Sequence, residues 1–214
     1  QLDSSGQMEG MDGFEQQAFD LILGSARDAF DVNKENRKTR DRYGSGLGEN
    51  LLKARRLCQA GCSFITVSYG GWDMHGGILR GFNGGRSEQV DQGVSALIED
   101  LEQRGMLQDV LVDVTGEFGR TPRILKVPNA YLTPGRDHWG AVQTALFAGG
   151  GVQGGRVIGS SDRIAAYPAD DPQRPEDFAA TIYHALGIPA RAHWSDPLGR
   201  PHPVYFGQPI ASLF

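Results

Sequence analysis

Side chains of the kinds that bind metal ions occur in two Gly-rich stretches of this chain. Asp73 and His75 lie in SYGGWDMHGG, residues 68–77, which begins as the apolar run 63–69 ends. Asp137 and His138 lie in GRDHWG, residues 135–140. Carboxylate oxygens and imidazole nitrogens are ligands that zinc, manganese and similar divalent ions take in proteins. These stretches therefore predict a metal site.

A third loop, GEFGRTPR at residues 116–123, adds a carboxylate and two arginines. Guanidinium groups are good partners for phosphate and sulfate. Two divalent ions about 4 Å apart can clamp a phosphoryl or sulfuryl group and activate water. We therefore predict a site for an anionic ester, with the metal ligands Asp73, His75, Glu117, Asp137 and His138 and the anion-binding residues Arg120, Arg123 and Arg136.

The alternative interpretation of each residue is structural. Asp73 then caps the following turn, His75 is an exposed loop histidine, and Glu117 pairs with Arg120. Because the three polar loops follow three predicted strands, we favour the interpretation in which they converge.

Other chemistry is not supported by the sequence. It contains neither GxxxxGK[ST] nor GxSxG, which argues against a nucleotide-binding loop and a serine-hydrolase elbow. We interpret Cys58 and Cys62 as half-buried thiols. We place the remaining histidines, His184, His193 and His202, outside the site.

The elements that must position these loops alternate between helices and strands. Helical patterns cover 14–30 (with a break near Gly24), 49–60, 87–104 and 175–186. Continuous apolar runs at 63–69, 110–115 and 143–148 predict buried strands, and 155–158 predicts a short one. This order is typical of an α/β fold with a largely parallel sheet, whose strand ends bring their loops to one edge.

Size and charge narrow the class of protein. The 214 residues suit a single domain, 1–214, whose ends 1–12 and 190–214 we expect to be peripheral. The net charge of −5 does not favour nucleic acid as a partner. No apolar run reaches the roughly 20 residues that span a bilayer.

Five motifs resemble the DUF1501 family of bacterial proteins. They are, in order, GGWDMHGG, VTGEFGRTPRI, GRDHWG, FAGGGVQGGRVIGSSD and PEDFAATIYHALGI, and the likeness runs from Phe14 to Gly187. That family is similar to the alkaline phosphatase and sulfatase superfamily, here through VLVDVTGEFG and PEDFAATIYHALGI. The resemblance implies an alkaline-phosphatase-like, three-layer α/β/α sandwich with a mostly parallel sheet.

The resemblance also implies roles for single residues. Asp73 and His75 are similar to the Asp/His pair of one metal ion, Glu117 to the acidic ligand of a second, and His138 to a late histidine ligand. It implies one or two zinc ions, with manganese or calcium as alternatives. The implied substrate is a small-molecule or polysaccharide anionic ester, and the implied location is periplasmic or otherwise extracytoplasmic. The oligomeric state is not defined.

The sequence differs from the proteins that it resembles in two respects, and both affect the function that we expect. Glu117-Phe118 stands where the superfamily usually has Asp-His, so one imidazole ligand is missing. Family members are roughly twice this long, and their upstream part carries an export signal and the nucleophile region. We therefore expect a C-terminal portion whose fold is incomplete on its N-terminal side, whose nucleophile lies outside this chain, and which does not turn over substrate alone. A non-catalytic binding or scaffold protein is the alternative.

Overall fold

The computed structural model describes residues 25–128 and 131–214, and the chain divides into two compact units. Unit 1 comprises Gln1–Gly71 and Phe82–Asp100, and unit 2 comprises Trp72–Gly81 and Leu101–Phe214. Of the helix predicted over 14–30, the part before Ser25 lies outside the described residues.

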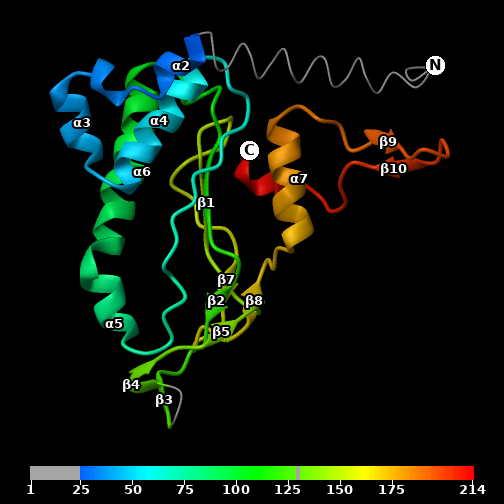
Figure 1. The fold of residues 1–214 in the computed structure, drawn as a ribbon. Helices are drawn as coiled ribbons and strands as arrows, with labels where there is room; N and C mark the ends of the chain where they lie inside the picture. Colours follow the sequence, from blue (N-terminus) through cyan, green and yellow to red (C-terminus); the bar gives the residue numbers. More distant parts are fainter. Residues whose placement is uncertain (1–24, 129–130) are drawn as a thin grey trace. The chain divides into compact units, whose positions relative to one another are not determined.

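The described part of unit 1 is helical (Figure 1). Its elements are α2 (Ser25–Ala29), the 3-10 helix η1 (Val32–Lys34), α3 (Arg37–Tyr43), α4 (Leu47–Gln59), the π-type turn η2 (Phe82–Arg86) and most of α6 (Ser87–Gln103). The helices α4 and α6 confirm the predictions over 49–60 and 87–104. The two lie close together, because a Cβ added at Gly93 of α6 would come within 2.9 Å of Leu51 of α4.

A buried ion network joins the helices of unit 1. The Arg55 side chain is 0% exposed, and its Nη2 lies 2.8 Å from Glu35 Oε1 and its Nε 2.8 Å from Asp100 Oδ2. The Tyr43 hydroxyl donates to the same Asp100 oxygen at 3.0 Å. Burial, and then the charge of Asp100, raise the pKa of the Tyr43 phenol. The network therefore fixes α3, α4 and α6 at one point of the unit 1 core.

Unit 2 contains short strands and two short helices beside one longer one. The strands are β1 (Val112–Thr115), β2 (Gly119–Arg120), β3 (Leu125–Val127), β4 (Tyr131–Gly135), β5 (His138–Trp139), β6 (Ala145–Ala148), β7 (Ser160–Ser161), β8 (Pro168–Asp170), β9 (His193–Ser195) and β10 (Pro201–Pro203). The helices are α5 (Ile78–Gly81), α7 (Pro175–Ala185) and the 3-10 helix η3 (Ala211–Leu213). None of the helices in the described ranges is both long and apolar enough to cross a membrane.

The predicted three-layer α/β/α sandwich with a mostly parallel, alkaline-phosphatase-like sheet is wrong. Across residues 25–128 and 131–214, each sheet has two strands and each pair is antiparallel: β1–β6, β2–β5, β3–β4, β7–β8 and β9–β10. A parallel pair needs a long crossover, usually a helix. The described residues between β1 and β6 form β2 to β5 instead, so the chain returns antiparallel to β1.

Two predicted strands are also absent from the ladders. The run 63–69 forms no helix or strand and pairs with no strand in the described part of the chain, and its Phe64 is 69% exposed. Residues 155–158 precede β7, which begins at Ser160. An apolar run alone does not create a strand, because a strand also needs a partner for its backbone groups.

The helix α7 confirms the prediction over 175–186. Pro175 occupies its first turn, and the Asp177 side chain accepts a hydrogen bond from the Arg174 backbone at 3.0 Å. Asp177 also accepts from the backbone of Gln208 at 2.9 Å. Phe178 packs against Phe147 of β6, with ring centroids 5.1 Å apart. These contacts hold α7 between the β1–β6 pair and the tail of the chain.

Asp113 of β1 gives unit 2 an expected pH dependence. Part of the residue is exposed, yet burial of its carboxyl raises the pKa of Asp113 to about 6. The folded state therefore keeps a proton that the unfolded chain, with a carboxyl pKa near 3.9, has lost. Between about pH 4 and pH 6 the folded state binds more protons, so stability falls as pH rises.

We therefore expect Asp113→Asn to unfold at a higher temperature than wild type above about pH 6, and the gap to close near pH 4. Thermal melts followed by circular dichroism across this range measure the gap. A gap that stays constant, or that widens toward acid pH, contradicts this assignment.

Candidate metal centre

The segment that carries Asp73 and His75 is held against β4. Gly76 forms an isolated antiparallel bridge with Gly135, and the Gly77 backbone donates to Pro134 at 3.1 Å. A Cβ at Gly135 would overlap the carbonyl oxygen of His75, so only glycine allows this approach. The close packing fixes the backbone of His75 beside the β3–β4 hairpin.

The β2–β5 pair positions His138 and Arg120. The two residues face each other across the ladder, in which Gly119 also pairs with Trp139. Just beyond, the Thr121 backbone donates to the Asp137 carbonyl at 2.9 Å, and the Asp137 backbone donates to the Thr121 hydroxyl at 3.0 Å. This double connection fixes the residue that precedes His138.

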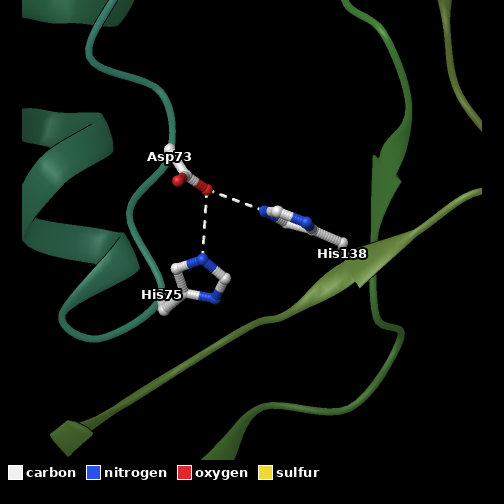
Figure 2. Close-up of side chains that lie close together, drawn as sticks. All are labelled: Asp73, His75 and His138. Atoms are coloured by element: carbon white, nitrogen blue, oxygen red, sulfur yellow. Dashed lines mark hydrogen bonds and ion pairs between the residues drawn. The ribbon is translucent and has the colours of Figure 1, made fainter. Parts of the chain in front are cut away.

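Asp73, His75 and His138 converge in unit 2. His138 Nε2 lies 2.7 Å and His75 Nε2 3.0 Å from the same oxygen, Oδ1 of Asp73. Figure 2 shows both rings pointing toward that oxygen from different segments. Within residues 25–128 and 131–214, these three side chains are the group whose ligand atoms lie within 4.8 Å of one another.

The cluster is open to solvent and electrostatically favourable for a carboxylate. The side chain of Asp73 is 75% exposed, that of His138 45% and that of His75 33%. The hydrogen bond with His138, and then the charges of His75, His138 and Arg120, lower the pKa of the Asp73 carboxyl. Asp73 is therefore ionised and available as a ligand at neutral pH.

The donor set fits a divalent ion. Catalytic zinc sites commonly have three protein ligands drawn from histidines and carboxylates, and leave one position open. Two atoms that bind one zinc ion at about 2.0–2.1 Å lie about 3.3 Å apart in tetrahedral geometry. The separations here, 2.7 Å and 3.0 Å to Asp73 and at most 4.8 Å in the group, lie on either side of that spacing. The three side chains thus offer ligand types, at about the spacing, that one divalent ion takes.

The two other predicted metal ligands, Asp137 and Glu117, lie outside the three-residue group. Asp137 contacts the far nitrogen of His75, with Oδ1 3.2 Å from Nδ1, and does not join the three-residue group. Glu117 is exposed and is also outside the group. Next to it, the Phe118 ring packs on the His138 ring with centroids 4.5 Å apart. At this point the chain offers an apolar contact and not a further ligand.

The three arginines are not equivalent. Arg120 Nη2 donates to the Trp72 carbonyl at 2.6 Å and lies 3.6 Å from Asp73 Oδ1. Its Nη1 is buried and makes no hydrogen bond with any of the described residues. No contact in the described part of the chain joins Arg123 or Arg136 to the cluster. Arg120 is thus the predicted anion-binding residue that the structure brings to the site.

Two neighbours of the site were not predicted. Thr121 holds Asp137. The centroid of the Tyr131 ring lies 6.2 Å from that of His75, and the Tyr131 hydroxyl is buried and has no hydrogen-bond partner among the described residues. Thr121 lies inside the GRTPR stretch that suggested the arginines, but nothing in its local sequence indicates a link to residue 137.

The geometry defines a solvent-open cluster of two histidines and one aspartate beside an arginine. The chain that carries it belongs to the DUF1501 family, described as proteins of unknown function, because the model of that family matches residues 3–214. No curated protein and no solved structure matched the chain. The family is thereby established, and the activity has to be argued from the site.

Proposed function

We propose that this chain binds a divalent metal ion through Asp73, His75 and His138, and that the metal site serves the hydrolysis of phosphate or sulfate esters. The observation that carries the proposal is the convergence of two imidazole Nε2 atoms on one oxygen of an ionised aspartate. The exposure of the three side chains leaves the cluster accessible to an ion from solvent.

The ligand types favour zinc or manganese. Calcium prefers a shell made of oxygen atoms, which the two histidines do not provide. The same set of two histidines and one carboxylate also suits ferrous iron. Titration of the metal-free protein with each ion would identify the metal that binds most tightly. When bound, the ion supplies a Lewis acid that polarises an ester oxygen.

The residues of the chain supply binding and orientation. Arg120 has hydrogen-bonding capacity left over and lies next to Asp73, where its charge can stabilise a non-bridging oxygen of a phosphate or sulfate group. We assign no nucleophile among the described residues. The resemblance to alkaline phosphatases and sulfatases supports the ester class, and with it we propose an extracytoplasmic location.

A second function, a binding module without turnover, is favoured by one observation. The Phe118 ring packs on the ring of His138. In the superfamily that the sequence resembles, this position usually supplies a further histidine ligand. A site with fewer ligands can retain one ion and bind an oxyanion without catalysing hydrolysis.

Hydrolysis of 4-nitrophenyl phosphate and 4-nitrophenyl sulfate by the zinc-loaded chain tests the proposal. The sequence predicts no turnover by this chain alone, because the usual nucleophile lies outside it, but a divalent ion can activate water in place of that nucleophile. We therefore expect a slow release of nitrophenol that is abolished by a chelator and by His138→Ala, because the variant removes one of the three ligands. Arg120→Met should retain zinc but weaken binding of inorganic phosphate or sulfate by at least about tenfold, since a charged hydrogen bond contributes about 1.5–3 kcal/mol.

The outcomes separate the two functions. Binding of zinc and of inorganic phosphate or sulfate without ester hydrolysis supports the binding module. A wild-type chain that binds neither metal nor oxyanion overturns both.

A further inference from the structure

His75 is held between two carboxylates, and this arrangement distinguishes its two ring nitrogens. Its Nε2 lies 3.0 Å from Asp73 Oδ1, and its Nδ1 lies 3.2 Å from Asp137 Oδ1. A neutral imidazole carries one N–H and one lone pair. It can therefore donate to only one of these oxygens, and its other nitrogen presents a lone pair.

We propose that Asp137 is a positioning residue for the metal site, an inference that rests on the proposed function. Asp137 accepts the Nδ1–H of His75 and thereby leaves the Nε2 lone pair available to the ion, which would share Asp73 Oδ1 as a second ligand. A histidine ligand commonly donates its second N–H to a carboxylate in this way, which fixes both the tautomer and the orientation of the ring.

The surroundings of Asp137 fit this role. The same Oδ1 atom accepts a hydrogen bond from the His138 backbone at 2.8 Å, so one oxygen connects both histidines of the cluster. The Asp137 backbone is in turn bonded twice to Thr121, through its N–H and its carbonyl. A residue whose backbone is held in this way is suited to orient a ligand, and its Oδ1 accepts from the His138 backbone and lies 3.2 Å from His75 Nδ1.

The test is zinc affinity, measured by calorimetry on the 214-residue chain. We expect Asp137→Ala to weaken zinc binding about 10- to 100-fold, because the loss of such a partner typically has that effect. Asp137→Asn should recover part of the loss, because its side-chain carbonyl still accepts the Nδ1–H. The control is Asp109→Asn, which removes one exposed carboxylate charge in the same unit away from the cluster.

A second readout reports the tautomer itself. Nitrogen-15 NMR of the histidine rings should show Nδ1–H for His75 in wild type and a shift toward Nε2–H in Asp137→Ala. A variant that simply lost fold stability would not change one ring selectively, and melting curves of the metal-free variants check the fold.

Three results would overturn the proposal. If wild type binds zinc and Asp137→Ala binds it as tightly as Asp109→Asn does, the positioning role fails while the proposed metal site stands. If Asp137→Ala and Asp137→Asn both lose zinc as completely as Asp73→Ala, Asp137 is itself a ligand. If wild type binds no zinc, the proposed function fails first and this inference fails with it.

Discussion

Replacing Asp73 with alanine is expected to weaken zinc binding by more than about 100-fold, beyond the 10- to 100-fold effect of losing a partner outside the coordination shell. The reason is geometric, because both histidine Nε2 atoms lie within 3.0 Å of Asp73 Oδ1. Without that oxygen, the two imidazoles have no anionic ligand between them. Calorimetric titration of the metal-free protein with zinc gives the affinity and the number of ions.

The fold should survive the Asp73→Ala change. The side chain is 75% exposed, so its removal leaves no buried cavity. We expect an unchanged melting temperature in the absence of metal and a loss of the increase that zinc gives to wild type. An Asp73→Ala protein that binds zinc like wild type would remove Asp73 from the site.

The second large effect is expected on stability, from Arg55→Met. Arg55 is fully buried between Glu35 and Asp100, and its Nη1 also donates to Gln59 at 2.8 Å. Methionine fills a similar space but leaves two carboxylates in the core with less compensating charge. Breaking a buried ion pair from one side typically costs about 3–5 kcal/mol in the free energy of unfolding.

Urea unfolding followed by the helical circular dichroism signal measures this loss. The matched control is Arg37→Met, because Arg37 contacts Asp41 at 3.4 Å with both side chains mostly exposed. Such surface pairs contribute at most about 1 kcal/mol. Equal effects of the two substitutions would show that the Arg55 network does not stabilise unit 1.

The helices were the part of the fold that the sequence predicted best. Leu47, Leu51 and Leu52 bury one side of α4, and the helix ends at Gln59, just before Gly61, which has a positive φ. These signals are local, because a helix satisfies its own backbone within four residues. The prediction of α7 from its N-terminal proline and acidic first turn succeeded for the same reason.

The sheets could not be predicted in the same way. Whether β1 pairs with β6, and in which direction, depends on contacts between residues 112–115 and 145–148. A continuous apolar run favours a parallel sheet, but it does not by itself fix the partner of a strand or the direction of pairing. We inferred a parallel sheet from the alternation of helices and strands, and the short strands between β1 and β6 show that no crossover helix separates them in the described residues.

The candidate site could be predicted in part, less well than the helices but better than the sheets. The residue types of Asp73, His75 and His138 could be selected from the Gly-rich loops, although the described residues form no parallel sheet edge of the kind expected to gather them. An antiparallel bridge at Gly76 and the β2–β5 ladder bring them together instead. The contact between Asp137 and His75 could not be predicted from the sequence. An aspartate that binds a metal ion and an aspartate that orients a histidine ligand look the same there.

The most direct test is to locate the ion. Crystals of the zinc-loaded 214-residue chain, measured on both sides of the zinc absorption edge, would show the metal by its anomalous scattering. We expect one peak within about 2.0–2.2 Å of Asp73 Oδ1 and of Nε2 of both His75 and His138. No peak at this position, or a peak bound elsewhere in the chain, would contradict the proposed site.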